Sequence, residues 1–150
     1  MQLLFGKEED IEQWMALVRG IRWNFPGLET EESLLAHRET VLRFMAKKQA
    51  LCVKTEEEIV GVLLFSYGRN MICCLGVSPR YRRCKVASML LQEALKNLDP
   101  TKDITVSTFR EEDEKGTAPR ALYKKFGFEE DELIEEFGYP NQRFVLRAEK

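Results

Sequence analysis

The 150-residue sequence predicts an α/β protein with a central mixed, mostly antiparallel sheet flanked by helices. Three apolar segments between residues 50 and 77 are separated by only a few residues each. Such connections are too short for parallel crossovers and indicate an antiparallel meander. The last segment, Met71–Val77, is followed by a helical pattern and then by another strand. That helix supplies one parallel crossover within the sheet.

Composition and charge limit the classes of protein to consider. A chain of this length fits one domain, residues 1–150, which buries roughly 68–70% of its unfolded surface. A net charge of -2 with 32% charged residues argues against a general nucleic-acid binder. No run approaches membrane-spanning length, and the first ten residues lack the pattern of a signal peptide. We therefore expect a cytoplasmic protein with neither nucleic-acid nor membrane partners.

The four cysteines favour a reduced protein over a disulfide framework. Cys52, Cys73, Cys74 and Cys84 contain no C-x-x-C spacing, and most lie in expected strands. A zinc site needs closely spaced Cys or His ligands, so no metal is expected either.

The first half of the chain shows one strand and two helices before the meander. Residues Gln2–Phe5 form a short strand pattern, and apolar residues at helical spacing predict a helix over about 9–21. A loop around Asn24–Leu28 leads to a second helix at about Glu31–Lys47. The meander then consists of strands at Ala50–Lys54, Ile59–Tyr67 and Met71–Val77.

The second half alternates helices and strands. Apolar spacing predicts a helix from Val86 to Leu98, followed by a strand at Ile104–Phe109 beside the Met71 strand. A helix with Pro119 in its first turn ends at Gly127. Two strands, Phe128–Phe137 and Arg143–Leu146, are expected around a turn at Gly138–Asn141.

The turn before the Val86 helix is unusual in its charge. Helix starts normally carry Ser, Thr, Asp or Asn to cap free backbone N–H groups, but Arg80, Arg82, Arg83 and Lys85 crowd this one. The positive end of the helix macrodipole makes cations unfavourable there unless an anion lies among them. The pattern indicates a bound phosphate or pyrophosphate, and a solvated basic turn is the alternative.

This turn resembles a known signature. Residues Arg82–Ala87 (R-R-C-K-V-A) resemble the R/Q-x-x-G-x-G/A acetyl-CoA motif of the GNAT superfamily of N-acetyltransferases, and Ala118–Phe128 is similar to that family's late A-x-x-L-Y-x-x-x-G-F segment. The predicted order of elements also matches the GNAT fold. The resemblance implies acetyl-CoA as cofactor, with its pyrophosphate held by Arg82, Arg83, Cys84, Lys85, Val86, Ala87 and Ser88.

Two positions depart from the family pattern. Lys85 stands at the first Gly of the motif, where a helical φ would not itself require glycine, so the residue is expected to be sterically tolerable. It either adds a phosphate contact or holds the pyrophosphate farther out. Gly116 stands where the family often has an Asn that contacts the cofactor, which puts that contact in doubt.

The resemblance also assigns the acyl-transfer site. It implies Tyr123 as the hydrogen-bond donor to the departing sulfur, and Leu75, Gly76 and Val77 as the strand segment that polarises the thioester carbonyl and holds the pantetheine arm. A bulge there is expected to separate the strand from its parallel neighbour, and Gly76 suits an irregular backbone.

The acceptor and its base are less defined. The resemblance places the acceptor wall at the loop that contains Asn24 and Phe25, and a small-molecule or peptide amine is expected. The Glu-rich terminal hairpin could attract a cationic amine. No general base is identifiable, because the strands between Ile59 and Val77 contain no Asp or Glu and the lone His37 is expected to be structural.

The expected function is transfer of acetyl from acetyl-CoA to a primary amine by direct attack in a ternary complex. A ping-pong route through Cys84 is disfavoured, since the matching family position lies at the pyrophosphate. The alternative is a non-catalytic acyl-CoA-binding or sensing domain, suggested by Lys85, Gly116 and the missing base. An interaction module with a vestigial site is a third possibility. The apolar last strand either pairs across a homodimer or closes its own sheet.

Overall fold

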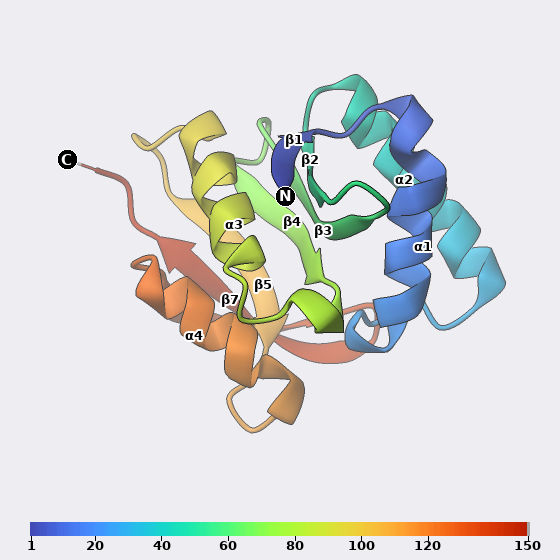
Figure 1. Ribbon diagram of the computed structural model, residues 1–150. Helices are drawn as coiled ribbons and strands as arrows, with labels where there is room; N and C mark the ends of the chain where they lie inside the picture. Colours follow the sequence, from blue (N-terminus) through green and yellow to red (C-terminus); the bar gives the residue numbers. More distant parts are fainter. Residues whose placement is uncertain (150) are drawn as a thin grey trace.

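The computed structural model describes residues 1–149 as one seven-stranded sheet with helices on both faces (Figure 1). The strands are β1 (Gln2–Phe5), β2 (Ala50–Lys54), β3 (Ile59–Ser66), β4 (Met71–Val77), β5 (Ile104–Phe109), β6 (Glu129–Glu136) and β7 (Tyr139–Leu146). The α-helices are α1 (Ile11–Ile21), α2 (Glu31–Ala46), α3 (Val86–Asn97) and α4 (Thr117–Lys125). Short 3₁₀ turns are η1 (Glu8–Asp10), η2 (Arg22–Asn24), η3 (Pro79–Tyr81) and η4 (Glu114–Gly116).

The strand order is β1-β2-β3-β4-β5-β7-β6. Strands β1 to β4 are antiparallel neighbours, and β4 and β5 form the parallel pair with α3 as the crossover. The predicted meander, the parallel neighbour and the mixed sheet are therefore confirmed. Strand β7 lies between β5 and β6, so the last strand closes its own sheet and its edges are not free for pairing across a dimer.

The last hairpin differs from the expectation. The turn predicted at Gly138–Asn141 is wrong, because β7 already begins at Tyr139, which pairs with Glu136. Phe137 and Gly138 close the hairpin alone, with φ of 53° and 72°. Two residues at positive φ give the turn geometry that matches the twist of two antiparallel strands. The sequence did not indicate this turn, because Phe137 occupies a position that usually carries Asn, Asp or Gly.

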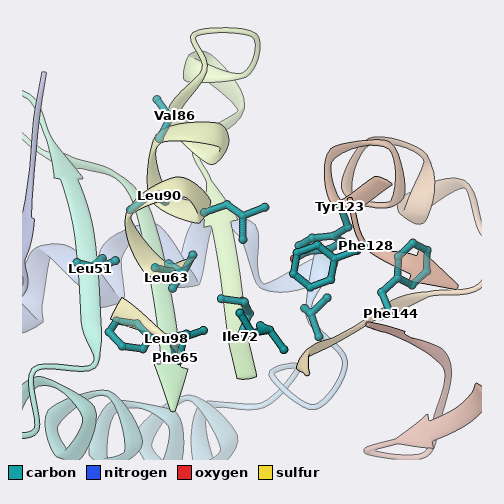
Figure 2. Packing of buried hydrophobic residues seen from close by; sticks show 14 of the residues in the cluster. Leu51, Leu63, Phe65, Ile72, Val86, Leu90, Leu98, Tyr123, Phe128 and Phe144 are labelled. Carbon is teal, nitrogen blue, oxygen red and sulfur yellow. The ribbon is translucent and has the colours of Figure 1, made fainter. Parts of the chain in front are cut away.

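Each face of the sheet has its own core. Helix α3 and Tyr123 of α4 contribute to the core on one face, which includes Leu63, Ile72 and Leu90 (Figure 2). Helices α1 and α2 cover the other face, where Trp14 and Val41 are fully buried. Because both faces of the sheet are filled by these cores, a binding site is expected at the ends or the open edges of the strands.

Candidate functional site

Strands β4 and β5 pair only at their beginnings. Met71 pairs with Thr105 and Ile72 with Val106, and no further pair joins the two strands. From Cys73 onward β4 runs beside β3 alone, so its other edge carries backbone N–H and C=O groups without a strand partner. An extended ligand can bind to such an edge as an added strand.

A β-bulge at Cys73 determines which residues face this opening. On β3, Leu64 pairs with Cys74 and Phe65 with Ile72, so Cys73 is the extra residue. The Ser78 N–H donates to the Val60 carbonyl at 2.8 Å. Since successive residues of a strand alternate in direction, Cys74 and Gly76 bond to β3, whereas Leu75 and Val77 direct their N–H and C=O groups toward the opening.

The expected role of Gly76 as the irregular residue is wrong. Gly76 pairs regularly with Val62, and the bulge lies three residues earlier. The lack of a side chain at Gly76 serves packing instead: a Cβ there would lie 2.6 Å from Ile21 Cδ1 and 3.0 Å from Phe25 Cζ. Gly76 therefore lets the end of α1 and the following loop rest directly on β4. Phe25 is partly buried at this contact, while Asn24 ends η2 beside it.

The start of α3 has no cap. Lys85 is its N-cap residue, and no side chain accepts a hydrogen bond from the first turn. The Arg82, Arg83, Cys84 and Lys85 side chains are exposed, whereas Val86 is buried where a Cβ on Gly61 of β3 would meet it. The uncapped start predicted from the sequence is thus present, with Ala87 and Ser88 half-buried in the first helical turn.

The backbone at this start contradicts one expectation about Lys85. Its φ of 63° and ψ of 17° lie in the left-handed region, and Arg83 also has a positive φ, of 69°. A side chain in this region costs roughly 1–2 kcal/mol relative to glycine, which adopts it freely. The motif's glycine position is therefore a conformational requirement, and Lys85 meets it under strain.

Tyr123 is buried beneath the opening. It comes from α4, is 4% exposed, and its ring centroid lies 5.7 Å from Phe128 and 6.2 Å from Phe144 (Figure 2). Burial, with a smaller contribution from Cys74, raises the pKa of the Tyr123 phenol well above its usual value. Its hydroxyl therefore stays protonated at neutral pH, so it can donate a hydrogen bond but cannot act as a base.

The segment after β5 holds a network that sequence reasoning missed. Asp113 accepts hydrogen bonds from the Lys115 N–H at 3.0 Å and from the Tyr139 hydroxyl at 2.6 Å. Tyr139 packs edge-to-face on Phe109, the last residue of β5. The sequence shows only that Asp113 belongs to an acidic run, Glu111–Asp113; its partners Tyr139 and Phe109 are brought together by the β5–β7 pairing.

Two other positions singled out in the sequence are Gly116 and His37. A Cβ on Gly116 would lie 2.9 Å from Phe109 Cβ and 3.2 Å from Arg120 Cδ, so a residue with a side chain, such as Asn, would not fit unless the chain shifted. His37 is half-buried on α2, and burial lowers the pKa of its imidazole.

Comparisons with known proteins are consistent with this geometry. A family model described as "Acetyltransferase (GNAT) domain" matches residues 46–130, more than half of the chain. The chain belongs to the GNAT acetyltransferase family. Its matched part contains β4, the basic turn and Tyr123.

Solved structures of similar fold match this chain over almost its whole length. A GNAT-family acetyltransferase from Bacillus cereus is 19% identical, with 99% of this chain and 98% of that chain covered and a TM-score of 0.73. An N-acetyltransferase from Staphylococcus aureus is 16% identical, with 97% of this chain and 100% of that chain covered and a TM-score of 0.76. The PaiA N-acetyltransferase from Thermoplasma acidophilum, solved in complex with coenzyme A, is 18% identical. The match covers 98% of this chain and 98% of that chain, with a TM-score of 0.71.

A search of curated proteins gave no match. Within residues 1–149, no helix has the length and apolar character needed to cross a membrane.

Proposed function

We propose that this GNAT domain is an N-acetyltransferase that transfers acetyl from acetyl-CoA to a primary amine by direct attack in a ternary complex. The observation that carries the proposal is the free edge of β4. Its Leu75 and Val77 backbone groups face an opening, and Val86 at the uncapped start of α3 lies against Gly61, the β3 partner of Val77. An extended arm with an anionic group at one end fits both features, which is the chemistry of an acyl-CoA.

The cofactor would be held at two places. At the start of α3, the N–H groups of Val86, Ala87 and Ser88 have no side-chain cap, and Arg82 and Arg83 are exposed beside them. Backbone donors, the helix dipole and guanidinium groups together suit a pyrophosphate. In the segment Leu75–Gly76–Val77, the Leu75 and Val77 backbone groups would hold the pantetheine arm along the edge of β4, while Gly76 bonds to β3.

The chain's own groups would assist the transfer. When bound, acetyl-CoA supplies an acyl group activated as a thioester. An N–H of Leu75 or Val77 would polarise the carbonyl oxygen, since a preorganised backbone donor stabilises charge that develops there. Tyr123 would donate a hydrogen bond to the sulfur as it leaves, a role that its raised pKa permits because the proton stays on the phenol.

Proton removal from the amine needs no buried base in this scheme. Strand β4 contains no Asp, Glu or His, and burial raises the pKa of the Cys74 thiol to about 12. The Cys74 thiol therefore stays protonated at neutral pH and would be a poor base or nucleophile. We propose that the acceptor attacks as the neutral amine, after losing its proton to water.

The first test is calorimetric titration with acetyl-CoA and with dephospho-coenzyme A, followed by a screen of amines. Dephospho-coenzyme A keeps the pyrophosphate, so both compounds should bind with micromolar affinity if the α3 start is the anchor. Saturable binding with no turnover of any amine would favour a non-catalytic acyl-CoA-binding domain. No binding of either compound would contradict both functions.

Tyr123→Phe tests the chemical step. We expect kcat to fall about 10- to 100-fold while the affinity for acetyl-CoA stays within about twofold, because the hydroxyl would act only on the departing sulfur. Tyr67→Phe is the matched control: Tyr67 lies in the β3–β4 turn, and its hydroxyl donates to the Lys48 carbonyl. An unchanged kcat in Tyr123→Phe would contradict the assigned role.

A further inference from the structure

Two loop segments stand on opposite sides of the mouth of the β4/β5 opening. Because the two strands are parallel, their C-terminal ends lie at the same end of the sheet, although the strands diverge from Cys73 onward. The end of α1 and Phe25 pack on β4 at Gly76. The η4 turn follows the end of β5.

Lys115 joins these two sides. Its Nζ donates to the Trp23 carbonyl at 3.2 Å, across 92 positions of sequence. The same ammonium lies 5.7 Å from the centroid of the Tyr139 ring, a favourable cation–π position. Although Glu112 and Glu114 are close in sequence, this lysine is directed to a backbone carbonyl of the segment that rests on β4.

The backbone that carries Lys115 is itself anchored. Asp113 accepts from the Lys115 N–H through one oxygen and from the Tyr139 hydroxyl through the other. The Tyr139 ring packs on Phe109 with centroids 5.8 Å apart. The lysine therefore extends from a turn that is fixed to both β5 and β7, and its far end restrains the Trp23 segment.

The hairpin of β6 and β7 restrains the same segment from another side. A Cβ on Gly27 would lie 3.1 Å from Phe137 Cγ. Phe137 is 83% exposed and has a positive φ of 53°. An exposed aromatic residue held in this conformation over Gly27 is consistent with a second contact that keeps the loop after α1 in place.

We propose that Lys115 is a positioning residue that spans the mouth of the opening and holds residues 23–25 as the wall against which the acceptor amine is placed. This inference rests on the proposed function, because it assigns the wall to the acceptor. The contacts of Lys115 are with Trp23, Asp113 and Tyr139, outside both proposed cofactor segments (75–77 and 82–88), so its loss should leave acetyl-CoA binding unchanged. Its loss should weaken productive binding of the acceptor.

Three variants separate the features of the side chain. Lys115→Met keeps the stem but removes donor and charge, Lys115→Gln keeps a neutral donor on a shorter side chain, and Lys115→Arg keeps both donor and charge. Lys125→Met is the matched control, since Lys125 is an exposed lysine of α4 outside this bridge. Lys115 is itself exposed, so none of these variants should impair folding.

The kinetic measurement uses the best amine from the screen. Lys115→Met should raise KM for the amine about tenfold, the value of one hydrogen bond from a charged donor, with KM for acetyl-CoA within about twofold. In Lys115→Arg the KM for the amine should equal that of the wild type. In Lys115→Gln it should lie between those of the wild type and Lys115→Met. An amine KM in Lys115→Met equal to that of Lys125→Met would overturn the inference.

A second measurement does not depend on turnover. Hydrogen exchange of the ligand-free protein should be faster over residues 23–28 in Lys115→Met and unchanged in Lys125→Met. Faster exchange with an unchanged amine KM would make the bridge structural only and overturn the inference. If the wild-type protein acetylates no amine although exchange responds as expected, the proposed function fails, and with it the acceptor role, while the bridge itself stands.

Discussion

Helices α2 and α3 begin in opposite ways. At α2, the Thr30 hydroxyl accepts a hydrogen bond from the Ser33 N–H at 3.0 Å, and the Ser33 hydroxyl oxygen accepts one from the Thr30 N–H at 3.1 Å. Two glutamates, Glu31 and Glu32, complement the helix dipole in the first turn. At α3 there is no cap, no acidic residue in the first turn, and a positive φ at the N-cap residue.

The difference distinguishes a structural helix start from one suited to a ligand. The chain itself satisfies the amides of α2, so that start is complete without any other molecule. At α3 the amides and the surrounding basic side chains leave an excess of positive potential that a bound anion would neutralise. We therefore expect changes at α3 to alter ligand binding and changes at α2 to alter stability.

Charge reversal at α3 should have the largest effect. In an Arg82→Glu/Arg83→Glu double variant, acetyl-CoA should bind at least about 100-fold more weakly, because charge-assisted contacts worth roughly 1.5–3 kcal/mol each are lost. Isothermal calorimetry measures the change. The matched control is Arg19→Glu, at an exposed arginine of α1 that pairs with Glu31. Equal binding by the double variant and the control would show that the α3 start is not the anchor.

Much of this contrast was predictable from local sequence. The uncapped basic start, the bounds of β4 and the parallel crossover all follow from residue types and their spacing. The bulge at Cys73 was not predictable, because it is defined by the register with β3. The left-handed conformation of Arg83 carries no sequence signal either, since residues with side chains rarely adopt it. For Lys85 the only signal is the glycine that the family motif has at this position, which the sequence analysis did not connect with a positive φ.

The same limit applies to the acceptor side. Asn24 and Phe25 could be proposed from the family resemblance, and Phe25 does pack on Gly76 of β4. The bridge from Lys115 to the Trp23 carbonyl joins residues far apart in sequence and depends on how the loops after α1 and β5 approach each other. Local patterns of charge and hydrophobicity cannot encode such a contact.

Removing the α2 cap should have an intermediate effect, confined to stability. Thr30→Ala should lower the free energy of unfolding by about 1 kcal/mol, because the Ser33 N–H loses its acceptor at the helix start. Urea denaturation measures the change, and acetyl-CoA affinity should stay within error of the wild type. Thr40→Ala is the control for loss of a threonine outside the cap, because Thr40 is a half-buried residue in the interior of α2 whose hydroxyl donates to the Ala36 carbonyl. A clear loss of acetyl-CoA affinity in Thr30→Ala would break the proposed separation between the two helix starts.

The smallest effect, and the most informative about Lys85, is expected for Lys85→Gly. Glycine relieves a left-handed conformation that costs a side chain roughly 1–2 kcal/mol, but it also gains entropy in the unfolded chain, so stability should rise by only about 0.5–1 kcal/mol. The effect on acetyl-CoA affinity separates the two expectations for this residue. Weaker binding in Lys85→Gly would mean that the ammonium contacts a phosphate, and tighter binding would mean that the side chain holds the pyrophosphate away. Lys85→Ala is the control, because it removes the ammonium but keeps the strain. If Lys85→Gly were no more stable than Lys85→Ala, the inference that the backbone is strained at residue 85 would be wrong.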